Sequence, residues 1–269
     1  MGERERLLLY CEQIRAGSQV MPLSLRCCLL LLVACLSGPA WAESRLLFAY
    51  GKHDGPPHAF MSERAPRELQ GGILFDIGME IGRRLEVRVG FVEVPRPRLP
   101  SWLEEGKVHA HCQLNPEWVD VPQQLLWSHE LFSTADRFYL AGSRSENVHR
   151  HEDLKGMRLG AIRGYTYSEP LTRLVNSGAV QREDASSTQQ LVQMLVRGRI
   201  EALLTDEIVA DYLLSLQPYD IAGAPLEDAR QGRFCAYSAK APIPFERFNE
   251  VVRAMIDEGR VREIINQYR

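Results

Sequence analysis

The chain has 269 residues, of which 45% are hydrophobic and 25% are charged, and its formal net charge is -3. This composition is close to the average of soluble globular proteins, and the length suits one large domain or two small ones. Acidic and basic residues are well mixed and form no basic stripe, so we expect no nucleic-acid partner.

The first 42 residues have the pattern of a leader. A short segment that starts at Met21 and carries one positive charge, Arg26, precedes ten uncharged residues, 27–36. Ala40-Trp41-Ala42 then places small residues at the first and third positions of a cleavage site. The uncharged run is too short for a stable membrane anchor. We therefore predict a leader over 1–42, with a signal peptide at 21–42, and with translation starting at Met21 so that residues 1–20 are not made.

The leader allows two other interpretations. Leu32-Val33-Ala34-Cys35 resembles a lipoprotein signal, in which case Cys35 would carry a lipid anchor. The uncharged run could also be a buried helix of a cytoplasmic protein. We favour cleavage after Ala42, because Gly38 and Pro39 break the run just before the small-residue site. This interpretation predicts a protein exported to the periplasm.

After the leader, strand-like apolar segments alternate with amphipathic helices. The first part has predicted strands over 45–50, 87–94, 108–114 and 137–141, and predicted helices over 72–85 and 99–105. The pattern then restarts, with strands over 157–162, 179–182, 200–204 and 234–238 and helices over 168–175, 188–196, 208–216, 245–256 and 260–268. This alternation indicates the α/β class, and its two rounds indicate two lobes. Ligands of such sheets bind beyond the carboxyl ends of the strands.

Two cysteines lie outside the leader, Cys112 and Cys235. Two distant cysteines are not a disulfide framework, and a free cysteine is usually a small buried residue. We expect two separate buried thiols, although one bond in an oxidising compartment is the alternative.

Short motifs follow one another through the chain after the leader. The first part carries Pro56-Pro57-His58-Ala59-Phe60, Gly72-Ile73-Leu74-Phe75-Asp76-Ile77, Arg98-Leu99-Pro100 with Leu103-Glu104-Glu105-Gly106-Lys107-Val108, and Leu131-Phe132-Ser133. The second part carries Asp153-Leu154-Lys155-Gly156-Met157-Arg158-Leu159-Gly160 and Leu195-Val196-Arg197-Gly198-Arg199-Ile200-Glu201-Ala202. Their order over about residues 45–269 resembles that of the family 3 solute-binding proteins of ABC transporters, whose best-known members bind polar amino acids.

The resemblance implies the type II periplasmic binding protein fold, with two lobes that are each a sheet flanked by helices. Lobe 1 would be discontinuous, with residues 43–141 and 235–269, and lobe 2 would be inserted as residues 142–234. Two crossing strands near Tyr139 and Ala236 would form the hinge.

The function implied is capture of a small polar solute, amino acid-like or another charged organic compound, between the lobes. An ABC permease would be the partner, and we expect a monomer without catalytic residues, cofactor or metal. The same fold serves as a periplasmic sensor input, and a few relatives, such as cyclohexadienyl dehydratases, are enzymes. An enzyme would need a general acid or base near the ligand, for which Glu117, His58 and Asp206 are available.

Arg163-Gly164-Tyr165-Thr166-Tyr167 follows a predicted strand and opens a predicted helix. Backbone N–H groups at a helix start favour an anion, and a glycine lets a ligand approach closely. Thr166 would add a hydroxyl and Arg163 a forked cation. The resemblance implies that this turn grips a carboxylate. The alternative is a plain helix cap.

Asp206, His58 and Phe60 are further candidate ligand contacts. At the position of Asp206, the family's aspartate binds the ammonium group of its ligand, whereas the alternative role is an N-cap. The resemblance places His58 and Phe60 in the loop that carries an aromatic wall over the ligand. Ordinary packing is the alternative for both.

Trp118 departs from the family pattern. It stands in Asn115-Pro116-Glu117-Trp118-Val119, where the family commonly has an arginine that holds an α-carboxylate. An indole carries no charge and cannot replace a bidentate cation. An ordinary α-amino acid ligand is therefore in doubt unless Arg96, Arg98 or Arg163 substitutes. Trp118 could instead stack on an aromatic or cationic ligand.

His109 and His111 alternate on a predicted strand, so their rings should share a face. His53 ends the first strand and could be a neighbour, and three histidines could bind zinc. We favour histidines that face solvent or form hydrogen bonds, and assign no metal.

Overall fold

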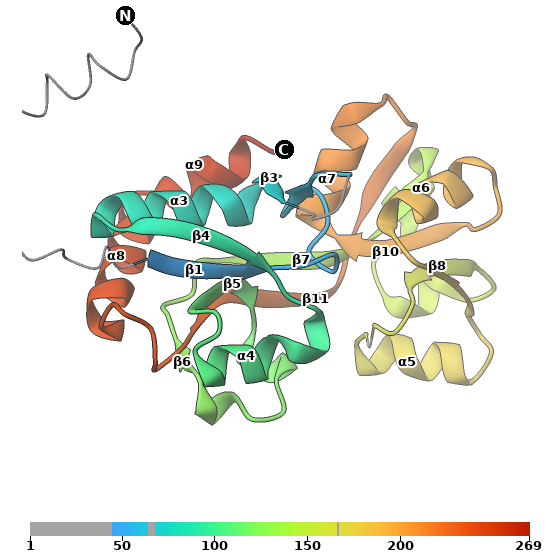
Figure 1. Ribbon diagram of the computed structural model, residues 1–269. Coiled ribbons are helices and arrows are strands. Elements are labelled where there is room, and N and C mark those ends of the chain that lie inside the picture. Colours follow the sequence, from blue (N-terminus) through green and yellow to red (C-terminus); the bar gives the residue numbers. More distant parts are fainter. Residues whose placement is uncertain (1–44, 64–67, 166) are drawn as a thin grey trace, which may run out of the picture. The chain divides into compact units, whose positions relative to one another are not determined.

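The computed structural model describes residues 45–63, 68–165 and 167–269 (Figure 1). The predicted leader, 1–42, lies outside the described residues, as does Thr166. None of the helices in the described part combines the length and apolar character that a bilayer crossing requires.

The strands are β1 (Arg45–Tyr50), β2 (Phe60–Met61), β3 (Leu69–Gly71), β4 (Arg88–Glu93), β5 (Ala110–Leu114), β6 (Leu126–Trp127), β7 (Phe132–Ala141), β8 (Arg158–Ile162), β9 (Gln181–Ala185), β10 (Ala202–Asp206) and β11 (Ile221–Tyr237). The α-helices are α3 (Ile73–Leu85), α4 (Leu99–Glu105), α5 (Glu169–Asn176), α6 (Thr188–Val196), α7 (Glu207–Leu216), α8 (Phe245–Asp257) and α9 (Arg260–Asn266). Most of these elements begin and end within a few residues of their predicted bounds.

Strands β4, β1, β5 and β11 lie side by side in this order, with β1 parallel to β4 and β5. Because alternate residues of a strand point to opposite faces, Leu46 and Phe48 of β1 pack against α3 and α8, whereas Ala49 packs against α4. Figure 1 shows α3 above β1 and α4 below it. This first sheet is therefore covered on both faces, as expected for the α/β class.

The second group of strands continues in the order β11, β7, β10, β8 and β9. Strand β8 is parallel to β9 and β10. Phe138 and Leu140 of β7 face the cluster that holds Leu171 of α5, and Tyr139 between them faces Leu191 of α6. The same alternation thus builds a second core with helices on both faces (Figure 1).

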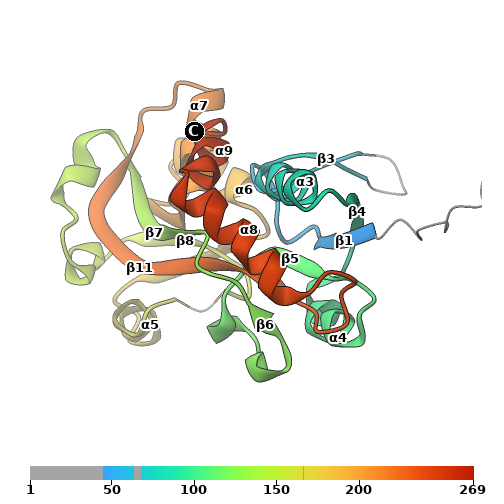
Figure 2. The same cartoon turned by 90° about the vertical axis from the view of Figure 1, so that its left-hand side faces the viewer.

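Strands β7 and β11 cross between the two groups. Residues 234–237 of β11 pair with β5, whereas residues 221–233 of the same strand pair with β7 (Figure 2). The two-lobed α/β class is confirmed. The strand over 221–233 was not predicted, because its glycines and charged residues break the alternation of apolar and polar residues. The division into 43–141 with 235–269 and 142–234 stays a prediction.

Cys112 of β5 and Cys235 of β11 form a disulfide with an S–S distance of 2.00 Å. The expectation of two separate thiols is therefore wrong. The two residues are 123 positions apart in sequence, and only the antiparallel pairing of β5 with β11 brings them together. Both are buried in the same core.

The loop that carries His58 is held by the start of α3. Backbone N–H groups of Ile73 and Leu74 donate to the carbonyls of Pro57 and His58, at 3.1 and 3.0 Å. Gly72 has a φ of 105°, and a Cβ there would lie 2.6 Å from the His58 carbonyl oxygen. Only glycine suits both the conformation and the close approach, which explains the glycine that opens the Gly72–Ile77 motif.

Candidate functional site

One face of the crossing strands collects polar side chains. In the register of β7 and β11, Thr134 lies opposite Gln231. Asp136 of β7 lies opposite Asp206 of β10. Arg233 is two residues beyond Gln231, so its side chain leaves the same face of β11. Five polar residues from three strands therefore meet where the two sheets join.

Arg233 and Asp206 form a buried ion pair at this face. The guanidinium Nη2 lies 3.2 Å from Oδ2 of Asp206, and the side chains are 9% and 14% exposed. Oδ1 of Asp206 accepts hydrogen bonds from the N–H groups of Ile208 and Val209 at the start of α7. Asp206 is thus both the predicted N-cap and a charged group beside a buried arginine.

Trp118 is the flat neighbour of this arginine. The guanidinium carbon of Arg233 lies 4.5 Å from the centroid of the Trp118 ring, and that of Arg96 lies 6.0 Å from it. An indole face attracts a cation at these distances. Trp118 therefore stacks on two arginines of this chain, and 36% of its surface stays exposed.

Asp136 carries the most unusual carboxyl of the face. Burial raises its pKa, the negative charge of Asp206 raises it further and Arg233 lowers it, with a result of about 7. Burial also lowers the pKa of Arg233, against which Asp206 and Asp136 act. One guanidinium thus pairs with Asp206 and also acts electrostatically on Asp136. The arrangement favours an additional positive group, because that group would ionise Asp136 and pair with it.

Three unpartnered polar atoms accompany these charges. Within the described part of the chain, Nε of Arg233, Oγ1 of Thr134 and Oε1 of Gln231 are buried without a hydrogen-bond partner. A buried polar atom without a partner costs free energy. Such atoms at one face indicate a place where a polar molecule would be held.

His58 lies close to the same charges. It is 2% exposed, and burial lowers its pKa although the carboxylates of Asp206 and Asp54 act to raise it. Its Nδ1 is a further buried atom without a hydrogen-bond partner among the described residues. A neutral imidazole here can donate or accept a hydrogen bond.

Tyr165 is the part of the 163–167 segment that reaches toward the charged face. It is 48% exposed. Desolvation raises the pKa of its hydroxyl, and the charges of Arg96, Asp136, Asp54 and Arg233 also act on that group. The charges of this face therefore act on the Tyr165 hydroxyl, although about half of the residue is exposed.

The other predicted contacts are placed elsewhere or outside the described residues. The hydroxyl of Tyr167 accepts from the Ile162 N–H at 2.9 Å, and its ring packs under Arg182. Phe60 contacts the rings of Tyr212 and Tyr268. Arg98 is exposed at the end of the 3-10 helix Arg96–Arg98, and Arg163 and Gly164 lie in an exposed turn after β8. Thr166 is not among the described residues. The structure therefore brings together His58, Trp118, Tyr165 and Asp206.

Sequence reasoning missed Arg233 and Asp136. Arg233 falls inside the predicted inserted lobe, 142–234, and Asp136 falls just before the predicted strand over 137–141. The available signal was a charged residue within each of two strands that cross between lobes, where a buried charge needs a partner. This signal becomes visible only when β11 is known to extend over Ile221–Tyr237 and to pair with β7.

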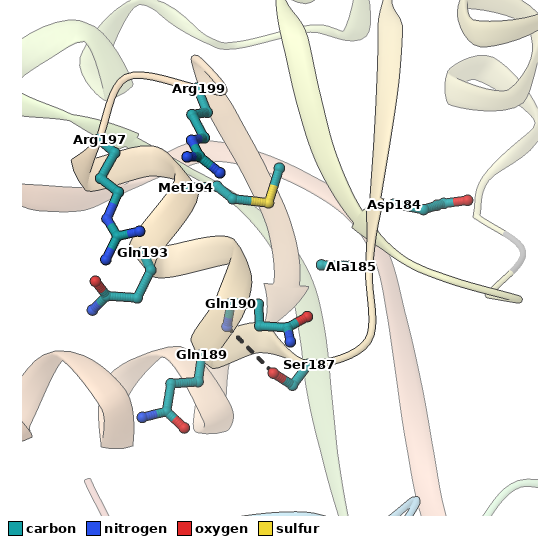
Figure 3. A pocket seen from close by; sticks show the side chains of 9 residues that line it. All are labelled: Asp184, Ala185, Ser187, Gln189, Gln190, Gln193, Met194, Arg197 and Arg199. Carbon is teal, nitrogen blue, oxygen red and sulfur yellow. Dashed lines mark hydrogen bonds between the residues drawn. The ribbon is translucent and has the colours of Figure 1, made fainter.

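A separate hollow lies along α6. It is lined by Asp184, Ala185, Ser187, Gln189, Gln190, Gln193, Met194, Arg197 and Arg199 (Figure 3). None of the predicted ligand residues lines it. The Ser187 hydroxyl within it accepts from the Gln190 N–H as a helix cap.

The fold defines a two-lobed α/β protein with a charged face where its two sheets join. No protein-family model matches the chain. An L-arginine-binding protein of Pseudomonas aeruginosa is 23% identical to this chain over 214 residues, which are 77% of this chain and 82% of that protein.

Solved structures agree on the fold. An ancestral arginine-binding protein bound to arginine has a TM-score of 0.63 at 20% identity, covering 84% of this chain and 98% of that one. An ancestral amino acid-binding protein, described as a precursor of cyclohexadienyl dehydratase, has a TM-score of 0.61 at 16% identity, covering 84% and 95%. The resemblance to family 3 solute-binding proteins is therefore confirmed at the level of the fold.

Proposed function

We propose that this protein captures a small polar solute with a cationic group between its two lobes and delivers it to an ABC permease. The observation that carries the proposal is the face made by Arg233, Asp206, Asp136 and Trp118. It holds two carboxyls and one guanidinium, most of them withdrawn from solvent. The name of the arginine-binding relative supports the same class of ligand.

The charges suggest how such a solute is oriented. Arg233 offers a buried, unpartnered Nε–H to a carboxylate, and so takes the part that the sequence analysis assigned to Arg96, Arg98 or Arg163. Asp136 and Asp206 offer two carboxyls to an ammonium or guanidinium group. A basic amino acid satisfies both sides, whereas an acidic one repels the carboxyls.

A ligand screen tests this proposal. We expect arginine, lysine and related cations to raise the melting temperature of the protein, because a ligand that binds only the folded state stabilises it by mass action. Glutamate and neutral sugars should have no effect. Asp136→Asn should weaken binding of the cations, and the exposed Glu104→Gln serves as the matched control. If glutamate shifts the melting temperature more than arginine does, the charge argument is wrong.

An enzymatic role is the second candidate, because a carboxyl with a pKa of about 7 suits general acid or base catalysis. The dehydratase precursor among the structural neighbours has the same fold. We propose binding without turnover. Mass spectrometry after incubation with each bound compound tests this. A product that the parent forms and Asp136→Asn does not form would show that the protein is an enzyme.

Ser168, His151 and Asp228 form a second cluster that resembles a hydrolase triad in composition only. The Ser168 hydroxyl donates to Oδ1 of Asp228 at 2.5 Å. This carboxylate oxygen also lies 2.8 Å from Nε2 of His151. Nε2 of His151 also lies 3.4 Å from the Ser168 hydroxyl, but it faces a carboxylate oxygen that can only accept. This nitrogen therefore carries a hydrogen and cannot remove the serine proton. The serine also caps α5, so its role is structural.

The same binding event could serve a sensor instead of a transporter. Uptake of labelled ligand in cells that lack this protein separates the two, because only the transport role predicts slower uptake. Export to the periplasm is part of the proposal and is supported by the Cys112–Cys235 disulfide, since such bonds persist in oxidising compartments. N-terminal sequencing of the exported protein should give Glu43 as the first residue.

A further inference from the structure

Three potential metal ligands meet at the end of β1. His53 and Asp54 lie in the turn that follows this strand, and His111 lies on the neighbouring strand β5. One donor atom of each residue lies within 4.8 Å of the other two. The cluster contains two imidazoles and one carboxylate.

The hydrogen bonds of His111 fix which nitrogen is free. Its Nδ1 lies 3.0 Å from the carbonyl oxygen of Ala49. A carbonyl can only accept, so Nδ1 carries the hydrogen and Nε2 keeps its lone pair in the neutral ring. A backbone carbonyl that holds the far nitrogen of a histidine is the usual support of a metal-binding imidazole.

Asp54 is oriented by the backbone of its own turn. The N–H of Gly51 donates to Oδ2 of Asp54 at 2.7 Å. The other oxygen, Oδ1, lies 3.6 Å from Nε2 of His53 and 3.6 Å from Nε2 of His111. One carboxylate oxygen therefore faces both imidazoles.

These donors are withdrawn from water. The side chains of Asp54 and His111 are 3% and 2% exposed, and that of His53 is 16% exposed. Nε2 of His53 is buried without a hydrogen-bond partner among the described residues. The lone pair on Nε2 of His111 also faces Oδ1 of Asp54, which has lone pairs but no hydrogen in the ionised carboxylate. A cation between the three atoms would satisfy all of them.

We propose that His53, Asp54 and His111 bind a divalent first-row transition metal ion, with Zn²⁺ as the reference ion. Two imidazole nitrogens and one carboxylate oxygen are common zinc donors, and three protein ligands leave a position for water or another ligand. Bonds of about 2.0–2.1 Å in a tetrahedral site place ligand atoms about 3.3–3.4 Å from one another. The two distances of 3.6 Å need only a small contraction.

The site differs from the three histidines that the sequence offered. Nδ1 of His109 accepts a hydrogen bond from the Leu47 N–H at 3.0 Å, so that ring supports β1. Asp54, which follows His53 directly, takes the third position. The proposal does not depend on the identity of the solute.

The test measures Zn²⁺ binding by isothermal titration to the full-length chain, purified through a tag without histidine. We expect one equivalent of Zn²⁺ whose affinity falls at least about tenfold in His53→Gln, His111→Gln and Asp54→Asn. The control is His129→Gln, which removes an exposed histidine outside the cluster and should leave the affinity unchanged. Asp54→Asn keeps an oxygen for the Gly51 N–H, so it should preserve the turn, and circular dichroism checks each fold.

Cobalt separates this site from the cysteines of the leader. A Co²⁺ ion held by nitrogen and oxygen shows visible d–d bands without the charge-transfer absorption of a thiolate ligand. We expect bands of that kind that disappear in His53→Gln. Three results would overturn the proposal. The parent and all three cluster variants could bind Zn²⁺ with equal affinity, or the parent could fail to bind it. The third is a thiolate spectrum that is the same in the parent and the cluster variants.

Discussion

The segment 163–167 and the face of the crossing strands are both polar, but they differ in their exposure to water. Arg163 and Gly164 lie in an exposed turn, whereas Arg233 and Asp206 are 9% and 14% exposed and bonded to each other. Charges in water gain little from pairing, and buried charges depend strongly on it. We therefore expect binding energy to be concentrated at the crossing strands, although the 163–167 segment carries the more recognisable motif.

The largest effect should come from Arg233→Ala. Removal of the guanidinium takes away the group that we assign to the ligand carboxylate. Truncation of one partner of a buried charge pair across a binding interface costs about 2–5 kcal/mol. We therefore expect a loss of affinity of about 30-fold or more, measured by isothermal titration with arginine. Arg163→Ala is the matched control, and a larger loss there than in Arg233→Ala would reverse the comparison between the two regions.

The next effect concerns pH and Asp136. Its pKa is about 7 in the folded protein and lower when the chain is unfolded, so the folded state holds this proton more tightly. The resulting stability is present at acidic pH and is lost as pH rises toward and through 7. We expect this decrease between pH 5 and 8 in denaturant titrations of the parent, and a smaller decrease in Asp136→Asn. Equal decreases would show that Asp136 ionises normally.

The same proton should couple to the ligand. A bound cation favours the ionised carboxylate, so arginine should bind more tightly at pH 8 than at pH 6. The affinity of Asp136→Asn should depend less on pH. Titrations in buffers with different ionisation enthalpies would detect the proton released on binding, and an absence of release in the parent would contradict this coupling.

The smallest effect separates two neighbouring tyrosines. Tyr167→Phe removes the acceptor of the Ile162 N–H and should cost about 1 kcal/mol of folding free energy. Tyr165→Phe should leave stability unchanged and alter ligand affinity slightly, because the charges of the crossing strands act on its hydroxyl. Thermal melts and titrations of both variants check this contrast. The opposite pattern would place Tyr167 at the ligand and Tyr165 in the core.

The local elements were largely predictable from the sequence. The apolar spacing of Ile73, Ile77 and Ile81 predicts the helix that α3 provides, and these residues are buried as expected. Strand β11 was only partly predictable, because its partner β7 determines its extent and residues such as Gly223 and Gly232 carry no strand signal.

The candidate site was less predictable, because its residues are brought together by the register of β7, β10 and β11, which lie far apart in the sequence. Asp206 was found by its place after a strand, and Trp118 by its departure from the family pattern. Asp136 and Arg233 are 97 positions apart, and neither stands in a motif. The disulfide was missed for the same reason, since the contact of Cys112 with Cys235 depends on which strands are neighbours.

We expect the Cys112–Cys235 bond to limit where the two lobes can pivot. It fastens β11 to β5 within the first sheet, and the register of β11 shifts between Phe234 and Ala236. We therefore expect a rotation of the second sheet to leave β11 fixed at Cys235 and to bend the strand on the side of Arg233. The pivot of lobe closure would then lie beside the Arg233 guanidinium, which we assign to the ligand. A small rotation of the strand at this point would displace the distant end of the second lobe by a large distance.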